Sequence, residues 1–125
     1  MNADPLWPRY TLSVIGFVLM AILGSLGAAK VAAVPAMRAA AAHARLGVSA
    51  YRLIGVAELA AVAGLLLGRW WRFAGISAAI GILVLMAGAT AVHLRNRDSA
   101  VRFLPAIATA TLTIAYLILL GGVTP

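Results

Sequence analysis

The sequence predicts an all-α fold, an integral membrane antiparallel four-helix bundle with a short amphipathic interfacial segment between the first two spans. Composition gives one reason, since 64% of the residues are hydrophobic and 10% are charged, whereas about a quarter of a soluble domain is charged. Length gives another, because 125 residues hold about four spans of 20 residues and no soluble catalytic domain. We therefore expect a single transmembrane domain over residues 1–125.

Charge and cysteine content exclude several function classes. The chain has ten Lys or Arg residues against three Asp or Glu, a formal net charge of +7, and no cysteine. In so apolar a chain, we expect the excess of basic residues to set the membrane topology and to bind anionic lipid rather than nucleic acid. The absence of cysteine excludes disulfides, thiol relays and thiolate-held metal or iron–sulfur centres. The expected partners are membrane lipids, anionic lipids among them, and no nucleic acid.

The first span is expected over residues 11–29, after a short polar head whose two prolines discourage helix. Its 19 uncharged residues would cover about 28 Å, close to the hydrocarbon thickness of a bilayer. A cleaved signal peptide is the alternative interpretation. It fits less well because the span exceeds the usual apolar region of a signal and only Arg9 precedes it.

Residues 30–48 connect the first two spans and carry several basic side chains among Ala, Val and Met. Pro35 suits the first turn of a helix, and Arg38 and Arg45, seven residues apart, would share one helix face. We expect a short helix lying in the membrane interface with its basic side toward the headgroups; a solvated loop is the alternative.

The remaining spans are expected over residues 49–68, 73–92 and 103–123. The connection from Gly68 to Arg72 is short enough to require an antiparallel hairpin, and Pro105 falls in the first turn of the last span. Three basic residues lie on the side of the termini and seven on the other side. The positive-inside rule then predicts a multi-pass protein of the cell membrane with both termini outside the cytoplasm.

Glu58 lies near the middle of the second span, where a carboxylate costs about 2.5–3.5 kcal/mol on insertion scales. It should therefore be neutral, paired or directed into a polar cavity. Basic residues at the ends of three spans would lie above it at one mouth of the bundle, and Arg52 is the favoured partner because it shares the helix of Glu58. The predicted ligand-binding or polar cluster consists of Lys30, Tyr51, Arg52, Glu58, Thr90 and His93.

Each of these side chains also has a structural interpretation. Glu58 would be either a pin that fixes helix register or a ligand, proton or ion site. Lys30 would either extend to the headgroups or pair inward, and His93 would be a boundary histidine or a proton shuttle. We expect no metal site, because one would need more ligands than His93 and Glu58 from different helices. We also expect no catalytic residues, because the serines lack His and Asp partners at matched depth; the sequence therefore favours a protein that is not an enzyme.

Short motifs at the span ends are shared with a known family. Gly27–Lys30 closes the first span, Tyr51–Leu59 opens the second ahead of a Gly-Leu-Leu-Leu-Gly run, and Ala91–His93 closes the third. The Arg-x-Ile-Gly-x-x-Glu element within Tyr51–Leu59 is the most specific of them. From about Thr11 to Gly122 the chain resembles the DoxX-like family of small four-helix membrane proteins.

The resemblance implies fold and membrane residence more than activity. The family name comes from a subunit of a thiosulfate:quinone oxidoreductase, and some members resemble accessory subunits of redox complexes. Carried across residue by residue, the motifs mark Lys30, Arg52, Glu58 and His93. No quinone or sulfur-chemistry site is recognisable from the motifs, and the lack of cysteine argues against sulfur transfer through this chain.

Three functions follow from the pattern and the resemblance. The first is a non-catalytic accessory subunit that binds a lipid-like or quinone-like ligand around Glu58 and associates with a redox-enzyme partner. The second is a small oligomeric transporter or proton-coupled channel with Glu58 as the coupling residue, and the third is a structural or assembly protein. No cofactor is expected apart from a quinone as candidate ligand. Small residues at four-residue spacing, Ala60, Gly64 and Gly68, would permit a homo-oligomer.

Overall fold

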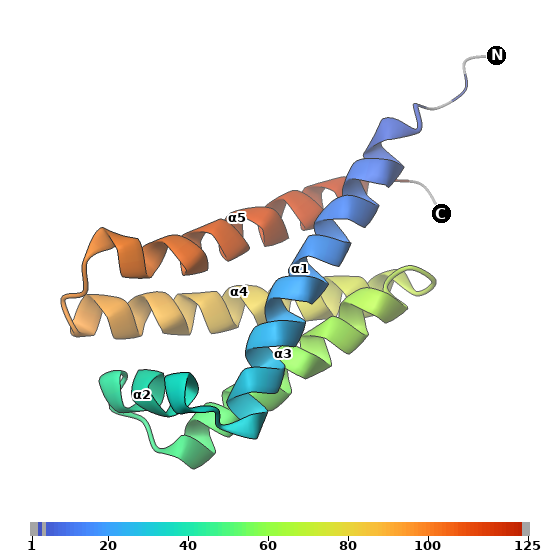
Figure 1. Cartoon of the computed structure of the whole chain (residues 1–125). Helices are drawn as coiled ribbons and strands as arrows, with labels where there is room; N and C mark the ends of the chain where they lie inside the picture. The colour runs from blue at the N-terminus through green and yellow to red at the C-terminus, as the bar shows by residue number, and fades with distance from the viewer. Residues whose placement is uncertain (1–2, 4, 124–125) are drawn as a thin grey trace.

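The computed structural model describes residue 3 and residues 5–123, and this part of the chain is all-α, with no strand. The all-α prediction is confirmed. Four of the helices are long and apolar enough to cross a membrane, and the other is short (Figure 1). In chain order the helices are α1 (Trp7–Ala32), α2 (Pro35–His43), α3 (Val48–Leu67), α4 (Arg72–Arg95) and α5 (Ala100–Gly122).

The long helices extend beyond the predicted spans at several ends. Helix α1 begins at Trp7, four residues before the predicted span, because Pro8 lies in its first turn, where the missing N–H has no intrahelical partner to lose. Helix α5 begins at Ala100, so Pro105 lies inside the helix and not in its first turn as predicted. The Thr109 hydroxyl donates a hydrogen bond to the Pro105 carbonyl at 2.8 Å.

The basic segment between the first two spans forms helix α2, with Pro35 in its first turn. Helix α1 ends at Ala32, and the next residue, Ala33, caps it in the left-handed region at φ 52°. The Arg38 Nε donates to the Ala33 carbonyl at 2.9 Å, which ties α2 to the end of α1. The position of α2 at a membrane interface remains a prediction.

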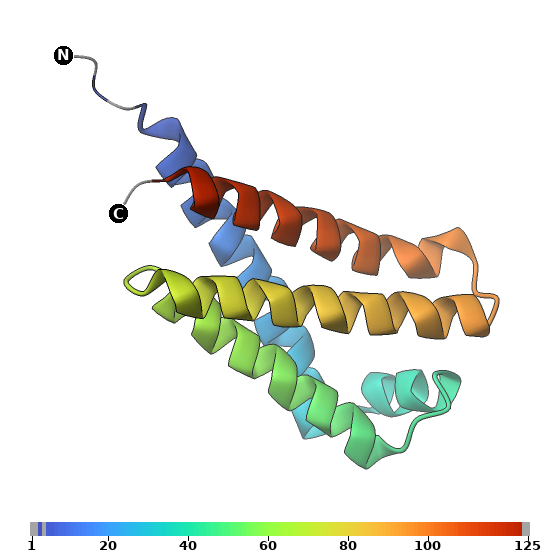
Figure 2. The ribbon, with the colours of Figure 1, turned by 180° about the vertical axis from the view of Figure 1, so that it is seen from behind.

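The four long helices contact one another in a closed ring. Helix α1 packs against α3 and α5, helix α4 also packs against α3 and α5, and α1 and α4 lie diagonally opposite. Helices α4 and α5 run side by side in opposite directions, while α1 crosses obliquely and α2 lies beside the start of α3 (Figures 1 and 2). Leu19, Leu23, Ala79 and Ile82 form the most deeply buried part of the core.

Small residues allow α3 and α4 to approach closely. A Cβ added at Gly64 would lie 2.7 Å from the Cβ of Ala78, and one added at Gly68 would lie 2.7 Å from the Cα of Gly75. Gly64 and Gly68, two members of the predicted small-residue stripe, are therefore used within the chain. A homo-oligomer remains a prediction. Gly64 and Gly68 do not support it, because both already pack against α4.

Candidate functional site: a buried ion pair, a histidine–aspartate cluster and a cavity

The Glu58 carboxylate is paired with Lys30. The Lys30 Nζ lies 3.0 Å from Oε1 and 3.1 Å from Oε2 of Glu58, so one ammonium group donates to both oxygens. Lys30 is 7% exposed and Glu58 is 4% exposed. Burial of either charge alone would carry a large desolvation cost, which the pairing offsets.

Two glycines set the geometry of this pair. Gly27 precedes Lys30 by three residues on α1, and Gly55 precedes Glu58 by three residues on α3, so each glycine shares a helix face with one charged residue. A Cβ added at Gly55 would lie 2.7 Å from the Cβ of Lys30 and 2.8 Å from the Gly27 carbonyl oxygen. Without side chains at this crossing, the backbones of α1 and α3 come close enough for the pair to form.

The sequence favoured Arg52 as the partner of Glu58, and this prediction was wrong. The partner is Lys30. Six residues separate Arg52 from Glu58, which places the two side chains about 120° apart around α3. Arg52 is exposed. Tyr51 does lie at the pair, because its ring centroid is 5.4 Å from the Lys30 Nζ, within the range of a cation–π contact.

The other two predicted cluster residues belong to α4 and do not join the pair. The Thr90 hydroxyl donates to the Met86 carbonyl of its own helix at 2.8 Å. The Nδ1 of His93 lies 2.7 Å from the Asp98 carboxylate, in the connection between α4 and α5. The structure thus brings together Lys30, Tyr51 and Glu58 and separates them from the two residues of α4.

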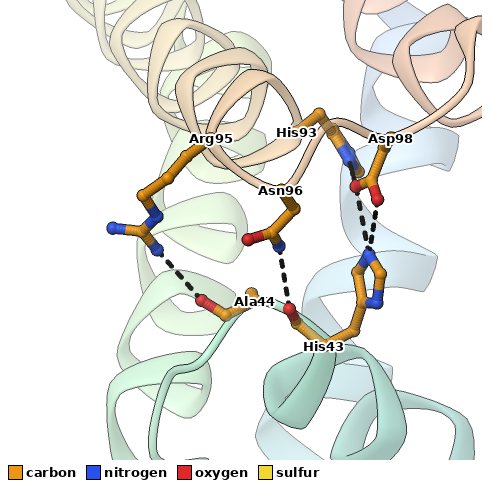
Figure 3. A network of polar contacts seen from close by, with 6 residues as sticks. All are labelled: His43, Ala44, His93, Arg95, Asn96 and Asp98. Atoms are coloured by element: carbon orange, nitrogen blue, oxygen red, sulfur yellow. Dashed lines mark hydrogen bonds and ion pairs between the residues drawn. The ribbon is translucent and has the colours of Figure 1, made fainter.

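Asp98 is the centre of a second polar cluster (Figure 3). Besides His93, the Nε2 of His43 lies 2.8 and 3.0 Å from its two oxygens, and the Asp98 side chain is 6% exposed. Asn96 donates to the His43 carbonyl at 2.8 Å, and Arg95 donates to the Ala44 carbonyl at 3.2 Å. Together these contacts fasten the end of α2 to the α4–α5 connection.

The environment of Asp98 favours its ionised form. The hydrogen bond with His93 is the largest cause that lowers the pKa of Asp98, and the hydrogen bond and charge of His43 and the charge of Arg102 act in the same direction. Desolvation of the carboxyl group raises the pKa but is outweighed. Sequence reasoning missed this cluster, because nothing in the chain pairs His43 with an acid 55 residues away.

A cavity of about 390 Å³ lies near the helix ends at which α3 turns into α4 and α5 ends. Lys30 and Glu58 are not among its lining residues. Its walls combine apolar side chains with Ser13, Tyr116 and three arginines. The lining consists of Arg9, Leu12, Ser13, Gly16, Met20, Leu65, Gly68, Arg69, Trp70, Arg72, Tyr116, Leu120 and Val123.

A more open groove of about 380 Å³ lies between α4 and α5 and is almost entirely apolar. Thr90 is the polar residue of its lining. Its hydroxyl group is already bonded within α4. This groove therefore presents fewer polar groups to a ligand than the cavity with the three arginines.

These features define a class of protein, a small helical chain with four apolar helices of membrane length. A buried ion pair joins two of these helices, α1 and α3. A model of the DoxX-like family matches residues 11–120, and the chain belongs to that family. It is therefore a multi-pass membrane protein. No curated protein and no solved structure gives a significant match to the chain.

Proposed function

We propose that the chain is a non-catalytic accessory membrane subunit that binds one lipid-like molecule in the cavity near Tyr116. The observation that carries this proposal is the cavity itself. Its volume of about 390 Å³ falls within the usual range of small-molecule sites, about 300–1,000 Å³. Leu12, Met20 and Leu65 supply apolar walls and Ser13 supplies a polar group, the combination that suits an amphiphile such as a quinone or an isoprenoid.

The ligand is assigned to this cavity and not to the surroundings of Glu58. The Glu58 oxygens already accept hydrogen bonds from Lys30, and the side chain is buried at a close helix crossing. A pair of this kind suits a role in fixing the packing of α1 against α3. The same burial weighs against a coupling role for Glu58 in a transporter, which requires access for an ion or proton.

Association with a membrane redox enzyme is the second part of the proposal, and the DoxX-like resemblance supports it. The chain contains no cysteine, so a redox role through thiols would have to belong to a partner. Cross-linking in native membranes, followed by mass spectrometry of the captured proteins, tests this part. Capture of a quinone- or sulfur-metabolising enzyme supports it, and repeated capture of unrelated proteins alone contradicts it.

We further propose that the four long helices form an antiparallel bundle in the membrane with both termini outside the cytoplasm. The distribution of basic residues supports this orientation. Because the chain has no cysteine, Ser49→Cys introduces one label site near the start of α3, and Trp70→Cys introduces one in the turn that follows α3. A membrane-impermeant maleimide added to intact cells should label Trp70→Cys alone. Labelling of Ser49→Cys alone would show that the orientation is the opposite of the one proposed.

Native mass spectrometry of the purified protein tests the binding site. Gly16 lines the cavity, and a Cβ added there would lie 3.6 Å from the ring of Tyr116, so Gly16→Leu fills the space. Gly81→Leu is the matched control, because a Cβ at Gly81 meets nothing within 4 Å. A bound lipid in the wild type and Gly81→Leu that is absent from Gly16→Leu supports the proposal. Equal occupancy in all three contradicts it.

A further inference from the structure

The cavity collects all the arginines of its end of the molecule. Of the ten Lys and Arg residues, seven belong to the opposite half of the bundle or to α2 and its flanking segments: Lys30, Arg38, Arg45, Arg52, Arg95, Arg97 and Arg102. The other three are Arg9, Arg69 and Arg72, and every one of them lines the cavity. No Asp or Glu is among the described residues that line it.

We propose that the ligand of this cavity carries an anionic headgroup, a phosphate or a carboxylate. This inference rests on the proposed lipid-binding function and narrows its ligand class. Guanidinium groups match phosphate and carboxylate oxygens with paired N–H donors, and such charge-assisted bonds are about twice as strong as neutral ones. A neutral quinone ring offers carbonyl acceptors but no negative charge, so it would give Arg69 and Arg72 no charge-assisted hydrogen bond.

The arginines reach the cavity from separate elements. Arg72, at the start of α4, donates to the carbonyls of Leu120 and Val123 at the end of α5, which uses two of the five N–H groups of a guanidinium. Arg69, in the turn between α3 and α4, has its guanidinium carbon 5.2 Å from the ring centroid of Phe17. Both guanidinium groups are thus held in place by α5 and α1 before a ligand binds, which lowers the entropy cost of binding.

The surrounding aromatic residues place the cavity at headgroup depth. Trp7, Tyr10, Trp70 and Trp71 are all exposed and lie at the start of α1 or in the α3–α4 turn. Exposed Trp and Tyr residues favour the membrane–water interface. A headgroup held by Arg69 would then lie level with the lipid headgroups, and its chain would extend along Leu12, Met20 and Leu65 toward the bundle interior.

A matched pair of isoprenoids, farnesyl phosphate and farnesol, tests the headgroup. Both are titrated into the purified protein in neutral detergent, with binding followed by native mass spectrometry and by thermal shift. We expect farnesyl phosphate to bind at least about tenfold more tightly than farnesol. Arg69→Gln should weaken the binding of farnesyl phosphate about tenfold, since a hydrogen bond to a charged group contributes that much. Arg52→Gln, an exposed arginine outside the cavity, should bind as the wild type does.

Competition with inorganic phosphate shows whether the site binds a free anion or the headgroup of an anionic lipid. If phosphate alone displaces farnesyl phosphate at millimolar concentration, the site recognises the free anion; if it does not, the site recognises an anionic lipid, and either result supports the inference. Equal binding of farnesyl phosphate and farnesol overturns the anionic headgroup but leaves the lipid cavity standing, provided that Gly16→Leu abolishes both. Equal loss of affinity in Arg69→Gln and Arg52→Gln also overturns it, because the effect would then be one of net charge.

Discussion

Replacing Glu58 by glutamine should destabilise the protein strongly, because it leaves the Lys30 ammonium group buried without a countercharge. The side chains of the pair are 9% and 5% exposed, and their shortest contact is 3.0 Å. Removing one partner of a buried ion pair costs about 3–5 kcal/mol. At roughly 3–5 °C per kcal/mol for a chain of this size, Tm should fall by about 10–25 °C. Circular dichroism at 222 nm during heating in detergent measures this change.

The double variant Lys30→Met/Glu58→Met separates the pair from its surroundings. Replacing both partners by apolar side chains of similar volume is often neutral or stabilising, so this variant should melt near the wild type. The difference between the double variant and the sum of the single variants gives the interaction energy. A wild-type Tm in Glu58→Gln, or a double variant as unstable as the single ones, would refute the view that the pair fixes the α1–α3 crossing.

Two further perturbations test the helix crossing and the second polar cluster. Gly55→Ala should cost about 1–3 kcal/mol through overpacking, because the new Cβ would lie 2.7 Å from that of Lys30; Gly81→Ala, in open space, is the control for thermal melting. The pKa of Asp98 is lowered from 3.8, so its stabilisation of α2 should be complete above that value and lost as pH falls through the lower folded value. Hydrogen exchange of α2, corrected for the intrinsic rate, should become faster in the wild type in acid. It should also be faster in Asp98→Asn than in the wild type at neutral pH. Unchanged exchange in both experiments would contradict the view that Asp98 fastens α2 to the α4–α5 connection.

The helices were predictable because their signals are local. Each apolar run of about 20 residues requires a helix in a bilayer, where every backbone polar group must be bonded internally, and Pro35 marked the start of α2. The ends were less predictable. Helix α1 begins at Trp7 and α5 at Ala100, since a helix continues past the apolar run wherever its backbone hydrogen bonds can continue.

The site was predictable only where depth and helix geometry determine it. The depth of Glu58 indicated a side chain that is neutral, paired or directed into a polar cavity, and the structure shows it paired. The angular separation along α3 would have excluded Arg52 as the partner. The choice of Lys30 depends on the approach of Gly27 to Gly55, a contact between two helices that no local pattern specifies. The cavity was not predicted, because its lining comes from α1, α3, α4, α5 and the connecting turn, and each segment alone is an ordinary apolar helix or turn.

The positions of the described acidic residues bear on the anionic ligand proposed for the cavity. Glu58 is paired with Lys30, and Asp98 lies between His43 and His93, so both acidic side chains that the structure describes are already used to join helices. No Asp or Glu is among the described residues that line the cavity, in a chain with a net charge of +7. The ligand proposed for the cavity would supply an anion to Arg69 and Arg72. A ligand without a negative charge would offer these two side chains no charge-assisted hydrogen bond.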